Sequence, residues 1–158
     1  MPKQIKTNAL RILDAAGISY REHFYDQENG IDGQSVAFSL GQNPQQVFKT
    51  LVARGTSRAL YVFVVPVAGT LNLKKAAKVC KEKSIEMIAH KELLPNTGYV
   101  HGGCSPIGMK KAYPTYLDET AQVFDTIYVS AGRIGTQAEL SPADLQRITG
   151  AQYADLAE

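Results

Sequence analysis

The stretch Val47-Phe-Lys-Thr-Leu-Val-Ala53, followed by Ala59-Leu-Tyr-Val-Phe-Val-Val65, decides the fold of this chain. Both runs are rich in the β-branched and aromatic residues that favour strands. The residues between them, Arg54-Gly-Thr-Ser-Arg58, are polar apart from a glycine, which is typical of a turn. The pattern therefore predicts a β-hairpin in the middle of the sequence.

Helical and strand-like patterns extend outward from this hairpin in both directions. Apolar spacing and capping residues predict helices over 5–16, 34–40, 72–83 and 142–149, with strands over 18–25, 84–88, 124–130 and 136–140. Turn-forming residues predict a mobile loop over 26–33 and a tight turn over 131–135. We therefore expect one α+β domain over 1–158, with a mixed, mostly antiparallel and partly barrel-like sheet flanked by helices.

Composition limits the class of protein. A length of 158 residues suits one domain, and the formal net charge of +2 is low for a general nucleic-acid coat protein. No long apolar run predicts a membrane span, and the first residues have no apolar signal segment. Two cysteines, Cys80 and Cys104, make a reduced cytoplasmic protein the simplest interpretation, although a single bridge between them stays open.

The segment Gly98-Tyr-Val-His-Gly-Gly-Cys-Ser-Pro-Ile-Gly-Met-Lys-Lys111 is the most unusual part of the chain because it contains four glycines and a proline. Paired glycines let a backbone approach a ligand closely and expose its N–H groups. Such groups can hold a carboxylate, a phosphate or a developing oxyanion. A tight turn between strands is the plainer interpretation, and the residues alone favour it.

Lys49 lies within the first strand of the predicted hairpin. Alternation places Lys49, Leu51 and Ala53 on one face of the strand. Phe48, Thr50 and Val52 lie on the other face. The lysine can protect an edge strand from aggregation. It can also reach into a pocket as a compact cation. The strand pattern by itself slightly favours the first role.

Cys104 suggests a nucleophile, with His101 three residues away as its base. A small buried cysteine is the more common case. The same two residues supply only two metal ligands, while His23 and His90 stand alone, so we expect neither a metal nor a cofactor.

Several segments together resemble one known family. They are Phe48-Lys-Thr-Leu51, Leu71-Asn-Leu-Lys-Lys-Ala-Ala77, Thr97-Gly-Tyr-Val-His-Gly-Gly-Cys-Ser-Pro-Ile-Gly108 and Asp125-Thr-Ile-Tyr-Val-Ser130. In order and spacing they look like the YbaK family of Cys-tRNA(Pro) deacylases, which are related to the editing domain of bacterial prolyl-tRNA synthetases. The resemblance covers nearly the whole chain.

The resemblance implies a trans-acting enzyme that removes cysteine from mischarged tRNA(Pro) without a metal or an enzyme nucleophile. By position in the motifs, Lys49 matches the essential lysine that positions the acylated 3′ end, and Gly102 and Gly103 match the backbone turn that contacts the aminoacyl group. The substrate's own thiol is expected to attack its ester carbonyl. The resemblance places the other substrate-binding residues at Tyr25, Ile31, Thr50, Ser130 and Gln137.

The chain departs from the family pattern at several positions. Relatives usually carry an aliphatic residue at Cys104, often an aromatic residue at Ile31 and often an acid at Gln137. The turn 130–135 also lacks one glycine and one basic residue. Removal of alanine or another small residue by water attack therefore stays open.

Two other hypotheses also remain. One is a cysteine-dependent hydrolase that uses Cys104, and the other is a non-catalytic module that binds tRNA or a synthetase. The expected partners are the acceptor end of tRNA(Pro) and prolyl-tRNA synthetase, with no membrane partner.

Overall fold

The central hairpin forms in the computed structural model, which describes residues 5–158. Strands β2 (Phe48–Gly55) and β3 (Leu60–Pro66) pair antiparallel, with Phe48 opposite Pro66 and Arg54 opposite Leu60. The prediction from the two β-rich runs is confirmed.

The hairpin lies inside a five-stranded mixed sheet with the order β4-β2-β3-β5-β8. The added strands are β4 (Ile85–Met87), β5 (Thr115–Asp118) and β8 (Gln152–Ala154). β4 pairs antiparallel with β2, whereas β5 pairs parallel with both β3 and β8.

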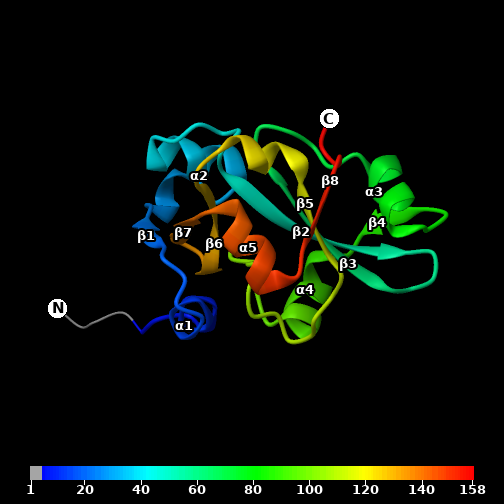
Figure 1. Ribbon diagram of the computed structural model, residues 1–158, viewed down its shortest axis with the longest axis horizontal. Helices are drawn as coiled ribbons and strands as arrows, with labels where there is room; N and C mark the ends of the chain where they lie inside the picture. The colour runs from blue at the N-terminus through cyan, green and yellow to red at the C-terminus, as the bar shows by residue number, and fades with distance from the viewer. Residues whose placement is uncertain (1–4) are drawn as a thin grey trace.

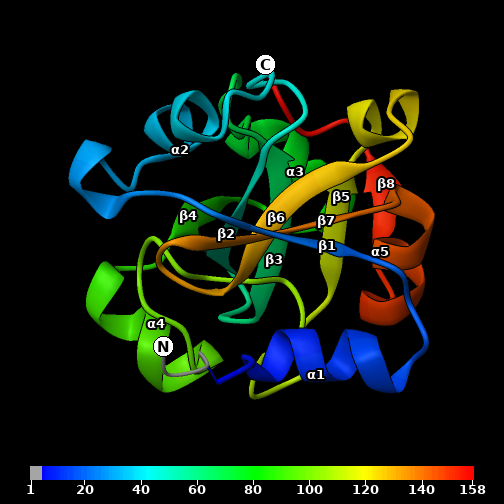
Figure 2. The same ribbon diagram turned by 90° about the vertical axis from the view of Figure 1, so that its left-hand side faces the viewer.

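A second, three-stranded sheet has the order β1-β7-β6 and is antiparallel throughout. Its strands are β1 (Arg21–Phe24), β6 (Ile127–Arg133) and β7 (Thr136–Leu140), with a bulge in β6 between Ser130 and Arg133. This small sheet crosses in front of the larger one in Figure 2. A parallel bridge between Val47 and Tyr128 links the two sheets.

The helices lie around the two sheets (Figure 1). Side chains of Thr7, Asp32, Asn72 and Ser141 accept backbone N–H groups at four helix starts, which satisfies donors that a helix leaves free. The helical segments are α1 (Asn8–Ala15), η1 (Gln27–Asn29), α2 (Gly33–Leu40), α3 (Leu73–Cys80), α4 (His90–Thr97), η2 (Glu119–Val123) and α5 (Pro142–Thr149).

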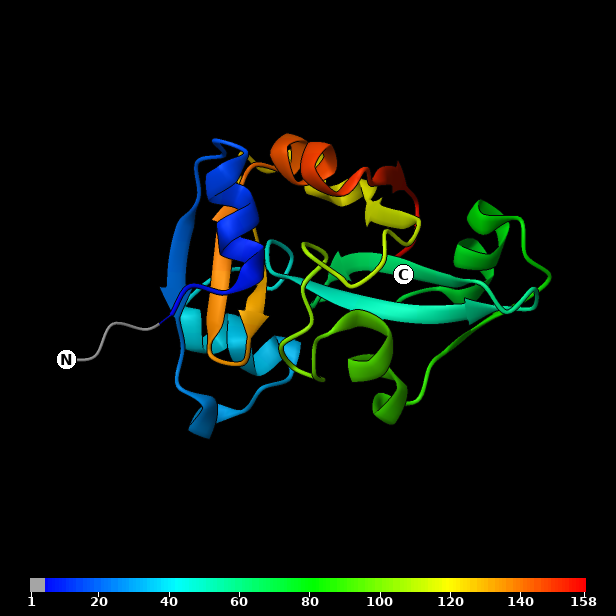
Figure 3. The same cartoon turned by 90° about the horizontal axis from the view of Figure 1, so that it is seen from below.

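The main core fills the space between the two sheets, which Figure 3 shows from below. Phe48 and Val52 enter it from the larger sheet, while Val129 and Leu140 enter it from the smaller one. A second cluster packs the opposite face of the larger sheet against α3 and includes Ala53. The alternation predicted for β2 is therefore confirmed, because its two sets of side chains join different clusters.

The α+β class and the mixed, mostly antiparallel pairing are confirmed, but the strands form two sheets and neither is closed into a barrel. The first helix begins after Thr7, and Ile5 is 72% exposed, so Ile5 does not belong to its apolar face. The predicted helix 72–83 ends earlier because Lys81 adopts a left-handed conformation at φ 59°. Strand β6 begins later than predicted and runs into the expected turn.

The loop predicted over 26–33 contains η1 and the first residue of α2, each capped by an aspartate. Among the described residues, no helix is long and apolar enough to span a membrane.

Candidate functional site

A cleft of about 330 Å³ opens where the two sheets meet, at the beginning of β2. Its volume is at the small end of the range for ligand sites, which suits a small group rather than a large cofactor. Its apolar wall comes from Ile31, Val36, Val47, Phe48, Leu51, Val67 and Leu93. Its polar and glycine positions include Asp32, Lys49, Thr50, His101, Gly102, Ser130 and Gln137.

The position of the cleft follows from the uneven pairing of β2. β4 pairs with β2 only at residues 53–55, so the first half of β2 has β3 on one side and an open edge on the other. Side chains from both faces of this half, Lys49 and Thr50, therefore line the same cleft. An open edge is also where a ligand can approach the backbone.

Lys49 is the cation of the cleft. Its Nζ donates a hydrogen bond to the carbonyl oxygen of Gly69 at 3.1 Å, and the side chain is partly buried. Burial lowers the pKa of Lys49 below its ordinary value. Within residues 5–158 no carboxylate lies within ion-pair distance of this ammonium. Since an ammonium has three N–H donors, the positive charge is available to a ligand.

Two buried polar atoms of the cleft lack a hydrogen-bond partner. They are Oγ1 of Thr50 and Oε1 of Gln137. An unsatisfied buried polar group costs about 1–3 kcal/mol. A ligand that forms a hydrogen bond with either atom removes this cost, which favours its binding. Ser130 is already engaged, because its Oγ accepts the backbone N–H of Gly132 at 3.1 Å.

The paired glycines have different surroundings. Gly102 lines the cleft with φ 88°, and a Cβ there would lie 2.9 Å from Cδ1 of Ile31. Gly103 is not among the lining residues, and its N–H already donates to the carbonyl of Val100. A Cβ on Gly103 would lie 3.0 Å from the backbone nitrogen of Ile134. Gly103 therefore supports the loop against the β6–β7 turn.

Tyr25 lies directly after β1 and is also not among the lining residues of the cleft. It is buried, and its backbone N–H donates to the carbonyl of Gly135. Its hydroxyl is buried without a partner. The structure thus brings together six of the eight residues assigned from the sequence, and leaves Tyr25 and Gly103 outside the lining.

The environment of Cys104 is unfavourable to a nucleophile. Burial raises the pKa of this thiol to about 12, with only a partial opposing effect from Thr97. A thiol attacks as its thiolate, which is scarce at neutral pH under these conditions. The nearby ring of His101 stacks on His90, with ring centroids 3.9 Å apart. Cys80 and Cys104 are both free, which excludes the bridge between them.

No group of three histidine, cysteine or carboxylate side chains within the described chain could hold a metal ion.

A family model described as the aminoacyl-tRNA editing domain matches residues 28–148. The chain belongs to this family. The match spans most of the chain and includes every lining residue of the cleft, and it confirms the resemblance to the YbaK-like editing proteins. Membership also confirms the expected enzyme class, which acts on the ester bond of an aminoacyl-tRNA.

Relatives of this editing domain agree with that assignment. The chain is 45% identical over 154 residues, covering 97% of this chain and 94% of the relative, to EbsC of Enterococcus faecalis. EbsC carries the provisional name Cys-tRNA(Pro)/Cys-tRNA(Cys) deacylase. A crystal structure provisionally described as a trans-editing enzyme for prolyl-tRNA synthetase is similar at TM-score 0.84 and 25% identity, over 96% of this chain and 98% of that chain.

The fold has a further match. The crystal structure of a hypothetical protein superposes on this editing domain at TM-score 0.86, with 24% identity, over 94% of this chain and 98% of that chain.

Sequence reasoning missed several lining residues of the editing-domain cleft, Asp32 among them, and it missed Gly69, the hydrogen-bond partner of Lys49. Asp32 lines the cleft and caps α2 through its bond to the backbone N–H of Ser35, and the Asp-Gly pair after a turn could have signalled such a cap. Gly69 binds Lys49 through its backbone carbonyl, which has no side-chain signal in the sequence.

Proposed function

We propose that this protein is a trans-acting deacylase that removes cysteine from mischarged tRNA(Pro). Its similarity to EbsC and to the provisional trans-editing enzyme supports this substrate class. A cytoplasmic location, where tRNA is charged, is part of the proposal.

The observation that carries the proposal is the isolated cation of Lys49 in a small cleft. The acylated 3′ end of a tRNA presents phosphate and ribose oxygens beside an ester. An ammonium that no carboxylate neutralises binds such oxygens well, because a compact charge needs no fixed planar geometry. Lys49 would hold the 3′ end at the open edge of β2, with the amino acid in the cleft.

The neutral polar groups of the cleft suit the aminoacyl part of the substrate. Gln137 offers Oε1 as an acceptor for the α-ammonium of the bound amino acid. Thr50 offers a hydroxyl that can donate to the ester or its oxyanion. Gly102 allows the loop to approach closely, since a side chain there would meet Ile31.

The substrate supplies the nucleophile. The cysteinyl thiol attacks its own ester carbonyl, a C–S bond forms, and the C–O bond to the ribose breaks. The thiol proton passes to the departing ribose oxygen, which gives a cyclic thioester and tRNA with a free hydroxyl. Because the thiol and the carbonyl belong to one molecule, attack proceeds at high effective concentration, and the protein needs to orient the ester.

Editing is needed because a synthetase cannot distinguish similar amino acids sufficiently by binding alone. A hydrophobic pocket discriminates by only about 1–3 kcal/mol per methylene, so amino acids of similar size require a second, hydrolytic step. We propose that tRNA identity is read largely by prolyl-tRNA synthetase as a partner, while this domain holds the acceptor end.

The test is deacylation of tRNA(Pro) charged separately with cysteine, serine, alanine or proline. Serine is the matched control because it replaces the thiol by a hydroxyl of similar size. We expect rapid loss of cysteine, slow loss of serine and retention of proline. Equal loss of cysteine, serine and alanine would keep a deacylase but replace thiol attack by water attack. Retention of all four would support a module that only binds.

A further inference from the structure

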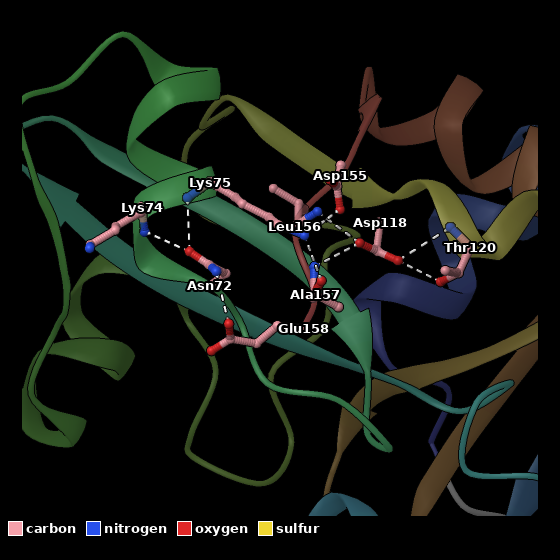
Figure 4. Close-up of polar contacts among 9 residues, drawn as sticks. All are labelled: Asn72, Lys74, Lys75, Asp118, Thr120, Asp155, Leu156, Ala157 and Glu158. Atoms are coloured by element: carbon pink, nitrogen blue, oxygen red, sulfur yellow. Dashed lines mark hydrogen bonds and ion pairs between the residues drawn. The ribbon is translucent and has the colours of Figure 1, made fainter.

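The carbonyl that holds Lys49 belongs to a segment that is itself anchored from a distance. Figure 4 shows the contacts around Asp118, which lies at the end of β5. We propose that Asp118 is a positioning residue for Lys49, acting through the segment 155–158 and the loop 69–72. The inference rests on the function proposed for Lys49 and adds a residue outside the cleft.

Asp118 is the fixed end of this connection. The residue is 1% exposed, and its Oδ1 accepts the backbone N–H groups of Leu156 and Ala157, each at 2.9 Å. Oδ2 accepts the backbone N–H and the hydroxyl of Thr120. A buried carboxylate is stable when such donors satisfy its oxygens, so Asp118 fastens the segment 155–158 to β5.

Helix α3 holds the same segment from its other side. Nζ of Lys75 lies 2.9 Å from a carboxylate oxygen of Asp155 and donates to the carbonyl of Ala157 at 3.2 Å. Asn72, which caps α3, donates through Nδ2 to the carboxylate of Glu158. Figure 4 shows the segment lying between these groups and Asp118.

The anchored segment pairs with the loop 69–72 in the manner of a short antiparallel ladder. Glu158 and Thr70 exchange backbone hydrogen bonds at 3.0 and 3.3 Å. Asn72 donates its backbone N–H to the carbonyl of Leu156 at 2.8 Å, and Leu71 bridges to Ala157. Loop 69–72 is therefore held at residues 70–72 by the segment that Asp118 anchors, and at Gly69 also by the bond from its N–H to the carbonyl of Pro66.

The last link is Gly69. A Cβ on Gly69 would lie 3.3 Å from the carbonyl oxygen of Glu158, so the loop and the segment are in close contact there. The carbonyl oxygen of Gly69 accepts the hydrogen bond from Nζ of Lys49. Lys49 is thus connected to Asp118 through a series of contacts: its side chain bonds the backbone of Gly69, loop 69–72 pairs with segment 155–158, and that segment bonds the side chain of Asp118.

Because the acceptor for Lys49 is a backbone carbonyl, that of Gly69, the position of the ammonium depends on the position of the loop. A free lysine side chain samples many rotamers, and holding it in one of them costs side-chain entropy. A carboxylate would hold Lys49 firmly but would neutralise it. A backbone carbonyl orients the ammonium while leaving its net charge for the ligand, provided that the carbonyl itself does not move.

Two variants test the connection without altering Lys49. Asp118→Asn keeps the shape of the side chain but replaces one acceptor oxygen by an NH₂ group. This group then faces donors that the carboxylate oxygen accepted from, so their hydrogen bonds are lost. Gly69→Ala keeps the fold elements and presses a methyl group toward Glu158. Ser141→Ala is the matched control, since it removes the hydrogen bond that caps α5, which joins Ser141 to the backbone N–H of Asp144 and does not involve the loop 69–72.

The first readout is single-turnover removal of cysteine from Cys-tRNA(Pro) at saturating enzyme. We expect a rate loss of at least about tenfold in Asp118→Asn and Gly69→Ala, because a small displacement of an orienting group is costly. Ser141→Ala should retain the wild-type rate. Wild-type rates in both folded variants would overturn the proposal, and an inactive wild type would instead overturn the proposed function.

The second readout does not depend on activity. The pH titration of the Lys49 side chain can be followed by NMR of protein labelled at lysine Cε, with the signal assigned by its loss in Lys49→Arg. Release of Lys49 toward solvent should move its lowered pKa back toward the ordinary lysine value in both variants. An unchanged titration in a folded Asp118→Asn or Gly69→Ala protein would contradict the proposed positioning, whichever rate is observed.

Discussion

At the scale of single residues, the cleft combines the cation of Lys49 with the carboxylate of Asp32, which caps α2, and with neutral polar groups. Lys49 is held by a carbonyl, and Thr50 and Gln137 present buried atoms that have no partner. Each of these features is unfavourable in an empty cleft and favourable once an acylated 3′ end is bound. The residue pattern is consistent with the proposed function, in which the cleft binds and orients a substrate that carries its own nucleophile.

The thiol of Cys104 should be dispensable for deacylation. Cys104 belongs to the core and also lines the cleft, but burial raises its pKa to about 12, so little thiolate exists at neutral pH. Cys104→Ala is expected to keep the wild-type single-turnover rate, with stability lowered by about 1 kcal/mol through the lost packing. Alkylation of the wild-type protein serves as the comparison. Loss of activity in a folded Cys104→Ala protein would favour the cysteine-hydrolase mechanism.

At the scale of elements, the glycine-rich loop lies against the turn between β6 and β7. Its Gly103 has no space for a side chain, because a Cβ would meet the backbone of Ile134 at 3.0 Å and of Arg133 at 3.3 Å. Backbone atoms cannot rotate away as the end of a side chain can. The loop and the small sheet therefore hold each other in place beside the cleft.

Gly103→Ala should consequently lower the free energy of unfolding by about 1–3 kcal/mol, as overpacking does in a tight interior. Urea denaturation gives this value directly. Gly17→Ala is a contrasting case, since Gly17 has φ 69° with open space around its Cβ position and reports backbone strain without a close contact, whereas Gly103 has the close contact without a positive φ. A Gly103→Ala protein as stable as the wild type would mean that the turn can move away from the loop.

The small sheet also contains a pH-sensitive contact. Burial raises the pKa of Glu139, but hydrogen bonds from Thr126 and His23 outweigh it and hold the pKa below the ordinary value of 4.5. A carboxylate with a lowered folded pKa contributes stability above its unfolded pKa, and that contribution disappears as the pH falls through the folded value.

Glu139→Gln should therefore be less stable than the wild type by about 1–2 kcal/mol at neutral pH. The difference should shrink as the pH falls below 4.5, the ordinary value for a glutamate, because the folded pKa lies lower than that. Thermal melts across this range measure it, with Glu28→Gln, an exposed side chain in η1, as the control. A stability difference that stays constant down to the acid range would show that the carboxylate charge contributes nothing.

Elements with local signals were predictable from the sequence, whereas elements fixed by distant partners were not. The helix that starts at Pro142 was evident from its serine cap and its final glycine. Helix α4 was missed because Ala89 provides no side-chain cap and Pro95 lies inside the helix. β5 and β8 are short and pair in parallel with strands far away in sequence, which no local pattern reveals.

At the scale of the whole molecule, the cleft exists because two sheets meet at the beginning of β2. The resemblance to a family assigned the cleft residues Lys49, Thr50, Ser130 and Gln137, which alternation alone could not bring together. The contact between Lys49 and Gly69 could not be predicted, because it depends on a loop that segment 155–158 holds in place.

The small size of the molecule limits how much of a tRNA it can recognise. Under the proposed function, these 158 residues with their formal net charge of +2 offer surface for the acceptor end but little for the rest of the tRNA. The isolated protein should remove cysteine from tRNA(Pro) and tRNA(Cys) at comparable rates, and added prolyl-tRNA synthetase should favour tRNA(Pro). A strong preference of the isolated protein for one of the two tRNAs would contradict this expectation.

The most direct test of the account is the single-turnover rate of cysteine removal from Cys-tRNA(Pro) by Lys49→Ala. Lys83→Ala, an exposed lysine outside the cleft, is the matched control. We predict a loss of about 100-fold or more in Lys49→Ala, the usual effect of removing one group that stabilises charge at a reacting centre, with an unchanged circular dichroism spectrum. A folded Lys49→Ala protein that cleaves at the wild-type rate would contradict the central role of this cation.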